Sequence, residues 1–424
     1  MADTVTEVTT QSYGSRVKNS CSGLCWGPVM ILAGIILLIW NEANAVAHHR
    51  SLDQGESNTI SVPSIASIDT VNEGKLIHVT GAATTSASIQ DDVFGVAAPN
   101  GEFYIKLQRS SMMYQWTESS QSQTETNLGG STTTTTTYTY QKEWMPTLVS
   151  SSSFNKPQGH ENPTVFPYPA DTFTASPINF GAYVLPEAIV DRMSWLSNYD
   201  GPLNVSQIPD AKLRNQTTVI TGPAFYVGNN SANPQVGDTQ VSFTVLKAPQ
   251  TMSIVAVQIG NTFAPYTAKA GREILLVQPG VKTQAQMYEE AHDNVTTVAW
   301  VLRFVGFLVI WFGLIQIMEP LTTMADVVPF CGNLLETITC WVLLPVALFI
   351  SLFFISLAWL AVRPLLLLPI LAVVGGAGYL LHRHNKQKGA DKNTRELPEE
   401  EHIEKPSKKE EEPEVQVVEG DEKV

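Results

Sequence analysis

Cysteine is scarce in this chain of 424 residues, and the long middle of the chain has none. The four cysteines are Cys21, Cys25, Cys331 and Cys340, so residues 47–294 contain no thiol. Disulfide bonds usually stabilise small extracellular domains that cannot bury a sufficient core. The middle region therefore has to be stable through an ordinary hydrophobic core, and its length is ample for one.

Basic residues are also in short supply. Lys and Arg number 26 against 40 Asp and Glu, which gives a formal net charge of −14. Surfaces that bind nucleic acid need clustered Lys and Arg, so we expect no nucleic-acid partner. The sequence also lacks the G-x-S-x-G, Walker A, H-E-x-x-H and C-x-x-C motifs. We therefore expect a protein that is not an enzyme and that uses no cofactor or metal ion.

Long apolar runs are what the sequence has instead. Residues 23–46, 295–318, 335–362 and 363–382 are each close to or above the roughly 20 residues that cross a bilayer as a helix. The first run is not followed by a small-x-small cleavage site, so we interpret it as a retained anchor rather than a signal peptide. Arg363 and Pro364 lie between the last two runs. We expect a turn there, because a charge and a proline favour a turn at the membrane surface. The pattern predicts four transmembrane helices.

Positive residues near the spans predict the orientation. Arg16 and Lys18 precede the first run and Arg383 follows the last, so both ends of the chain should face the cytosol. Residues 1–22 and the loop 319–334 are then cytosolic. The charged tail 383–424 should be disordered and cytosolic or nucleoplasmic. The domain at 47–294 should then be lumenal. Four glycosylation sequons in it agree with this placement, although chance in a Ser/Thr-rich stretch would explain them equally well, and Asn294 lies too close to the bilayer to be modified. The candidate acceptors are Asn204, Asn215 and Asn229.

The middle region is strand-rich, with two helical stretches. Alternating and β-branched residues predict six strands, and the second and third of these should form a long hairpin. They are residues 75–81, 102–116, 134–144, 217–227, 239–246 and 251–259. The apolar spacing of 186–199 and the polar stretch 283–294 predict helices, the latter leading directly into the second span. The predicted fold class is a multi-pass α-helical membrane protein with a large α+β, strand-rich lumenal domain.

Two features of the spans invite a functional explanation. Arg303 lies inside the second span, where it could line a pore or pair between helices; we favour a side chain that extends to the nearer membrane surface. Ala372, Gly375 and Gly376 on the fourth span would let another helix approach closely, within the chain or between subunits.

The histidines offer two weaker hypotheses. His48 and His49 with Glu42 could hold a metal ion, but adjacent helical residues point in different directions. His160 could act as a general base beside Glu161. A capped turn in a loop explains that pair equally well.

Short motifs in a fixed order resemble the transmembrane protein 43 (LUMA) family along nearly the whole chain. Met113-Tyr114-Gln115-Trp116 is the most specific of them. The matching positions are Asn41, Glu42, Asn72, Glu73, Gly74, Tyr114, Trp116, Trp144, Gly159, His160, Gly237, Asp238, Arg363 and Pro364. The sequence departs from the pattern at Ala43-Asn44, where family members resemble Gly-Arg.

The resemblance implies a location and a role. It implies residence in the membranes of the endoplasmic reticulum and inner nuclear membrane, self-association through the spans, and the organisation of protein complexes, which in animals include emerin and lamins. It also implies links to immune signalling and to a passive conductance in animals.

Our leading hypothesis is a non-enzymatic, self-associating membrane scaffold. A channel or channel subunit, with Arg303 and Gln316 on one span, is the second. A lumenal ligand-binding or lipid-modifying factor that uses His160 and Glu161 is the third.

Overall fold

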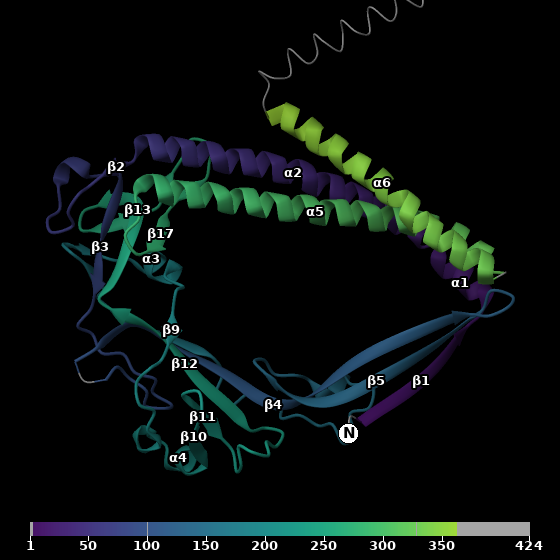
Figure 1. Cartoon of the computed structure of the whole chain (residues 1–424), viewed down its shortest axis with the longest axis horizontal. Coiled ribbons are helices and arrows are strands. Elements are labelled where there is room, and N and C mark those ends of the chain that lie inside the picture. Colours follow the sequence, from purple (N-terminus) through teal and green to yellow (C-terminus); the bar gives the residue numbers. More distant parts are fainter. Residues whose placement is uncertain (1–2, 100, 328, 363–424) are drawn as a thin grey trace, which may run out of the picture. The chain divides into compact units, whose positions relative to one another are not determined.

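Three long helices and a strand-rich domain make up the computed structural model, which describes residues 3–99, 101–327 and 329–362 (Figure 1). The helices are α2 (Gly23–Asn58), α5 (Gln284–Ala325) and α6 (Pro329–Val362). Each is long and apolar enough to cross a membrane. At 36 residues, α2 is about 54 Å long, whereas the hydrocarbon core of a bilayer is about 30 Å thick. It therefore extends well beyond the bilayer.

The first three predicted spans lie within these helices, but their boundaries differ. The predicted loop 319–334 is wrong, because the helix continues past Pro320 to Ala325 and the next helix begins at Pro329. The hydroxyl of Thr322 donates to the carbonyl of Glu319 within this continuation, at 3.0 Å. The fourth predicted span, with the tail behind it, lies outside the described residues.

Two sheets form most of the domain between α2 and α5. One has eight strands, in the order β1–β5–β4–β12–β11–β10, with β6 and β9 at its side. Its strands are β1 (Asp3–Gln11), β4 (Phe103–Thr126), β5 (Thr132–Met145), β6 (Asp171–Thr174), β9 (Ser197–Asn198), β10 (Thr217–Ile220), β11 (Ala224–Val227) and β12 (Thr239–Ala248).

The other main sheet has seven strands, in the order β14–β13–β3–β7–β8, with β17 and β2 at its side. Its strands are β2 (Ile60–Ser61), β3 (Leu76–Thr84), β7 (Asn179–Phe180), β8 (Tyr183–Val184), β13 (Gln250–Ile259), β14 (Thr262–Ala264) and β17 (Leu276–Pro279). A separate pair joins β15 (Tyr266–Thr267) to β16 (Glu273–Ile274). Five of the six predicted strand regions lie within single strands apart from their end residues, and the predicted hairpin is β4 with β5.

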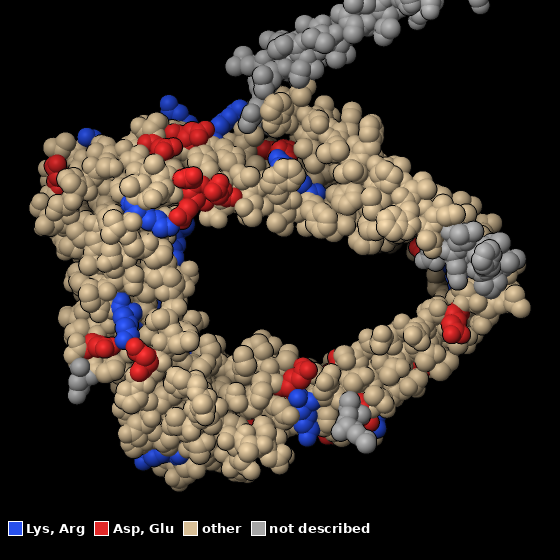
Figure 2. Space-filling model, viewed as in Figure 1, with Lys and Arg blue, Asp and Glu red and all other residues tan. Residues whose placement is uncertain are grey.

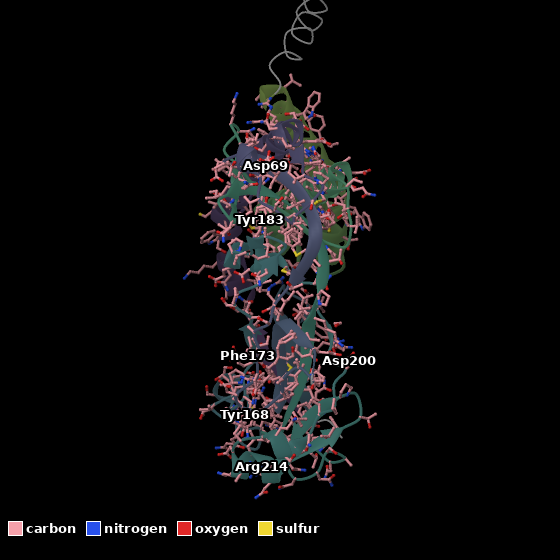
Figure 3. All side chains as sticks on the ribbon, turned by 90° about the vertical axis from the view of Figure 1, so that its left-hand side faces the viewer. Asp69, Tyr168, Phe173, Tyr183, Asp200 and Arg214 are labelled. Atoms are coloured by element: carbon pink, nitrogen blue, oxygen red, sulfur yellow. The ribbon has the colours of Figure 1, made fainter. Side chains whose placement is uncertain are left out.

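Each sheet has its own core, so the domain has two apolar centres. Tyr183 stacks on Phe263 within the core of the seven-stranded sheet, at 4.8 Å between ring centres. Tyr168 and Phe173 pack against the core of the eight-stranded sheet, which lies further from the helices (Figure 3). A strand-rich α+β domain is confirmed, with the helices α3 (Glu187–Arg192) and α4 (Ala211–Gln216) as its short helical parts.

Two sequence predictions inside the domain are wrong in detail. The helix predicted for 186–199 ends at Arg192, because Ser197 and Asn198 pair with β12 and the backbone has to become extended before them. The strand predicted for 217–227 is a hairpin of β10 and β11, since Gly222 takes a φ of +98° in the turn between them.

A third apolar cluster attaches the domain to the helices. Leu52 of α2 packs with Met287 and Tyr288 of α5 and with strand residues of the seven-stranded sheet. Thr283 begins α5 with a capping box that it forms with Gln286, so the helix starts inside this cluster. As predicted, the polar stretch runs directly into the second span. The cluster therefore packs both helices against the seven-stranded sheet.

The distal half of the eight-stranded sheet is a narrow ribbon of three strands, β1, β5 and β4, which we call the ribbon. β1 pairs antiparallel with β5 from Asp3–Tyr140 to Gln11–Thr132. The ribbon tip reaches the far ends of the helices (Figure 1). There Arg16 donates to the carbonyl of Gly130 at 2.7 Å and forms an ion pair with Asp326. The strand at 3–11 is absent from the sequence predictions, and residues 3–22 are joined to the ribbon rather than forming a separate N-terminal segment.

Candidate functional site

A charged pair joins α2 and α5 where the apolar parts of the two helices begin. Arg303 donates from Nε and Nη2 to the two carboxylate oxygens of Glu42, at 2.6 and 3.0 Å. The Glu42 side chain is 2 % exposed. The guanidinium also lies 4.6 Å from the centre of the Trp300 ring. One residue before Glu42, Asn41 donates to the carbonyl of Ala299 at 3.0 Å.

Of the two roles considered for Arg303, the geometry shows pairing between helices, because the carboxylate of Glu42 faces the guanidinium from the neighbouring helix. A buried charge without a partner is costly in a membrane. The pair and the Asn41 bond therefore fix the rotation and register of α2 against α5.

Glycines bring the same two helices into close contact further along. A Cβ built on Gly313 would lie 2.8 Å from the carbonyl oxygen of Gly27, and one on Gly34 would lie 3.1 Å from that of Gly306. Small residues at such positions allow backbones to approach and pack. We had predicted glycine packing for the fourth span, at Ala372, Gly375 and Gly376, which lies outside the described residues.

Above the ion pair, α2 and α5 line an open cavity of about 210 Å³, which we call the interhelical cavity. Its walls are mostly apolar, with a few amide and imidazole groups at the rim. The lining residues are Asn41, Asn44, Ala45, His48, Asn294, Val295, Val298 and Ala299. Arg272, just before β16, donates to the Asn44 side chain at this rim.

His49 and His292 meet across the helices beside this cavity. Their rings stack at 5.0 Å between centres, with the two Nδ1 atoms 2.7 Å apart. Asp53 lies 3.5 Å from Nε2 of His292. His48, Glu42 and His49 do not converge, since Glu42 is engaged by Arg303. Across the described ranges, no three His, Cys, Asp or Glu side chains are placed to hold a metal ion.

His160 is buried in an aromatic stack and not in a cleft. Its ring stacks on Tyr140 at 3.9 Å and meets the edge of Trp116 at 4.7 Å. Its Nδ1 is 2.9 Å from the carbonyl of Lys156, and its Nε2 is 3.2 Å from the Asp3 carboxylate of β1. Both ring nitrogens are therefore engaged in holding the ribbon to the neighbouring loop.

Glu161, the proposed partner of His160, is exposed and closes its own turn. It accepts a hydrogen bond from the backbone of Gly159 at 3.0 Å. That bond, with its own backbone amide, lowers the pKa of the exposed Glu161 carboxyl. A depressed pKa keeps the group ionised and unsuited to donating a proton near neutrality. The contacts of His160 and Glu161 hold the ribbon and the turn in place.

Comparison with known proteins identifies the family. The family model described as Transmembrane protein 43 matches residues 113–364, more than half of the chain. The chain belongs to the transmembrane protein 43 family. Transmembrane protein 43 of rat is 29% identical over 359 residues, covering 82% of this chain and 87% of that protein. The human protein is 28% identical over 370 residues, covering 85% and 90%.

A homolog from Drosophila melanogaster is 27% identical over 357 residues, covering 80% of this chain and 89% of that protein. No solved structure matches the chain.

Several positions that carry the resemblance to the transmembrane protein 43 family meet beside the ribbon. Tyr114 packs on Trp144 across β4 and β5, at 5.1 Å between ring centres. The carbonyl of Tyr114 accepts from the backbone of Gly237 at 2.9 Å. Asp238 accepts from the Tyr226 hydroxyl, and burial together with this carboxylate raises the pKa of that phenol. These residues tie the ribbon to β11 and β12.

Another family motif closes a turn in the seven-stranded sheet. Gly74 has a φ of +71° and donates to the carbonyl of Gln258 at 2.9 Å. The carboxylate of Glu73 accepts from the backbone of Gly260, at 2.9 and 3.1 Å. Asn72 is buried beside them. Arg363 and Pro364, which also carry the resemblance, lie outside the described residues.

The three candidate glycosylation sites are exposed on the half of the domain that surrounds the eight-stranded sheet. Asn204 begins a short 3₁₀ turn, and its side-chain oxygen accepts from the Ser206 backbone at 2.9 Å. Asn215 lies in α4, and Asn229 follows β11. All three side chains are reachable from solvent.

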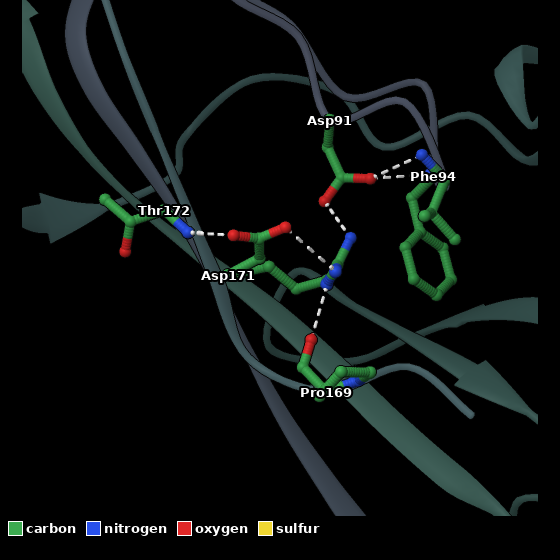
Figure 4. A network of polar contacts seen from close by, with 7 residues as sticks. Asp91, Phe94, Pro169, Asp171 and Thr172 are labelled. Carbon is green, nitrogen blue, oxygen red and sulfur yellow. Dashed lines mark hydrogen bonds and ion pairs between the residues drawn. The ribbon is translucent and has the colours of Figure 1, made fainter. Parts of the chain in front are cut away.

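Sequence reasoning missed one buried charge network. Arg109 of β4 donates to Asp91 at 2.6 Å and to the carbonyl of Pro169 at 2.9 Å, and lies 3.6 Å from Asp171 (Figure 4). Its guanidinium is 5.9 Å from the centre of the Phe94 ring. Because the buried guanidinium donates to a buried carboxylate and to a backbone carbonyl, this network stabilises the domain. Its members are far apart in the sequence, so no local pattern indicates it.

Proposed function

We propose that this member of the transmembrane protein 43 family is a non-enzymatic, self-associating membrane scaffold. In this proposal it organises protein complexes in the endoplasmic reticulum and inner nuclear membrane. Its partners are the lipid bilayer, further copies of itself and other proteins of those membranes, which in animals are emerin- and lamin-like. The resemblance of the sequence to the family supports the location and the partners.

The ribbon is the observation that carries self-association. The fourteen residue pairs of β4 and β5, Met113–Met145 through Thr126–Thr132, extend about 45 Å at 3.3 Å per residue. Its tip contacts Arg16 and Val327, at the helix ends opposite the domain core. If α2 and α5 cross the bilayer while this contact holds, the polar ribbon passes through bilayer depth.

Backbone outside a helix is tolerated at that depth only when protein or water shields it from lipid. A single copy offers neither, because the outer edge of β1 and the outer edge of β4 beyond Trp116 have no partner strand among the described residues. Apolar side chains such as Trp300, Phe304 and Phe349 are meanwhile exposed on the helices. In an assembly of several copies with helices outward and ribbons inward, the apolar helix surfaces would face lipid and the polar ribbons would be shielded from it.

The proposed sidedness follows the charges at the flanks. From Arg16 and Lys18 before α2, and Arg383 after the last predicted span, we propose that both ends of the chain face the cytosol or nucleoplasm and that the body of the domain is lumenal. Enzymatic removal of N-glycans from protein expressed in animal cells tests this placement. A mobility shift that is lost in the Asn204→Gln, Asn215→Gln, Asn229→Gln triple variant supports it. An unchanged mobility in both proteins, with the middle region digested by protease added to sealed microsomes, opposes it.

The mass of the purified protein tests self-association. Full-length chain in mild detergent should elute as one species whose protein mass, from light scattering, is an integral multiple of the chain mass. Envelope proteins should co-purify with it from animal cells. A strictly monomeric species without such partners would overturn the scaffold proposal.

A passive conductance is the second candidate function, and the ribbon rather than Arg303 now supports it. Arg303 is neutralised by Glu42, so it is not available as a pore-lining charge. The threonine- and serine-rich ribbon is the polar surface that could line a water-filled interior in an assembly. Reconstitution in planar bilayers tests this: steady current that persists in Arg303→Leu but disappears when residues 117–140 are shortened favours the ribbon. Bilayers that contain the protein and carry no current would rule out a passive conductance.

A further inference from the structure

The interhelical cavity lies at the level where a membrane helix passes from lipid to water. Trp40 and Trp300, exposed by 53% and 63%, mark this level on α2 and α5. Such rings prefer the headgroup layer. Asn41 and Ala299 are their immediate neighbours and line the cavity. Figure 2 shows charged side chains gathered over the domain-proximal parts of the molecule, while the long helices beyond are largely free of charge on this face. The cavity therefore opens beside the lipid headgroups.

The cavity has apolar walls and a polar rim, so it matches the apolar and polar parts of a lipid. Ala45, Val295 and Val298 form apolar walls, and Asn44 and His48 stand at the rim. Its volume of about 210 Å³ is below the roughly 300–1,000 Å³ of pockets that enclose whole small molecules. It fits the headgroup and glycerol region of a lipid whose acyl chains remain in the bilayer.

Arg272 gives this rim a charge. Its Nη2 donates to Asn44, and it lies within electrostatic range of His48. No carboxylate of a described residue is within ion-pair distance of its guanidinium, whereas Arg303, deeper between the helices, is neutralised by Glu42. Guanidinium groups recognise phosphate through paired, charge-assisted hydrogen bonds. A guanidinium beside the headgroup layer is placed to bind the phosphate of an anionic lipid.

We propose that the interhelical cavity binds an anionic phospholipid of the surrounding bilayer. The lipid phosphate accepts hydrogen bonds from Arg272 and from the amide of Asn44, while the glycerol region contacts Ala45 and Val298. The lipid would then bridge α2, α5 and the β15–β16 hairpin, joining membrane and domain at the place where the domain attaches.

Native mass spectrometry of the full chain, released from nanodiscs that contain phosphatidylcholine and phosphatidylinositol, tests the site. Wild type should retain phosphatidylinositol in preference to phosphatidylcholine. Arg272→Gln should lower that preference about tenfold, since one charge-assisted hydrogen bond is worth about that factor. Arg272→Lys should keep part of it. Lys247→Gln, which removes a cation paired with Glu102 and Asp200 far from the cavity, is the matched control and should change nothing.

Ala45→Phe separates the cavity from the charge. It keeps Arg272 but fills the apolar wall, so the retained lipid should be lost while the thermal unfolding midpoint stays near that of wild type. Equal retention of both lipids by wild type, or full retention by Ala45→Phe, overturns the proposal. So does displacement of the lipid by inorganic phosphate alone, which would make the site one for a free anion.

Discussion

Glu42 of α2 and Arg303 of α5 neutralise each other through two hydrogen bonds, although 260 residues of domain lie between them in the chain. The pair stands directly below the interhelical cavity and beside the Asn41–Ala299 bond. It therefore closes the polar end of the helix–helix contact, while the glycine contacts close the apolar end.

Breaking this pair should cost more than removing it. Arg303→Leu leaves the buried Glu42 carboxylate alone, which is expected to destabilise the helix pair by about 3–5 kcal/mol. The double variant Glu42→Leu, Arg303→Leu should recover much of that loss, because no charge remains to be buried. Thermal unfolding of the full chain in detergent measures both. Equal loss in the single and double variants would contradict the assignment of a mutually neutralising pair.

The surroundings of two glycines predict opposite effects of a Gly→Ala substitution on the stability of the protein. Gly313→Ala puts a methyl group 2.8 Å from the carbonyl of Gly27 and should destabilise the protein by about 1–3 kcal/mol. Gly14→Ala in α1 (Tyr13–Ser20) meets no atom within 4 Å, so it should be neutral or stabilising by up to about 1 kcal/mol. The same melting experiment compares them. A destabilised Gly14 variant beside an unaffected Gly313 variant would refute close helix packing.

His78 predicts a loss of stability in mild acid. Burial lowers its pKa below the ordinary value of 6.5, and its Nε2 lies 2.9 Å from the carbonyl of Lys282. The unfolded chain then takes up a proton first as the pH falls, so stability is complete above pH 6.5 and declines as the pH drops toward the folded pKa. His78→Gln should flatten this decline between pH 7 and 5. Identical pH profiles for the two proteins would show that another group is responsible.

The sequence carried enough information for the spans and for the central strands, because both depend on local patterns. Apolar length marks α2, α5 and α6, and alternation marks β3, β4, β5, β12 and β13. The site was only half visible: Arg303 was noticed as unusual, but its partner Glu42 is distant in sequence.

Other elements depend on distant partners and could not be predicted. β1 is rich in Thr and Val, yet nothing local indicates that it pairs with Thr132–Tyr140. The helix at 186–199 was overestimated because pairing of Ser197 with Val245 outweighs its apolar spacing. Tertiary contact decided each of these cases.

The register of β1 against β5 can be tested in the membrane itself. Val8 pairs with Thr135, so Val8→Cys and Thr135→Cys in a background with the four native cysteines replaced by Ser should form a disulfide under mild oxidant. The control pair is Val8→Cys with Thr136→Cys: Thr136 pairs with Glu7, and its side chain points to the opposite face of the ribbon, so it should cross-link poorly. Gel mobility with and without reductant, measured on intact membranes, detects the cross-link in both pairs.

Strong cross-linking of the first pair alone would show that β1, before α2, lies in the same sheet as β5, after α2. In that arrangement the polar ribbon requires shielding from lipid. Equal, weak cross-linking of both pairs would mean that β1 leaves the ribbon in the bilayer, and the argument for self-association would lose its physical basis.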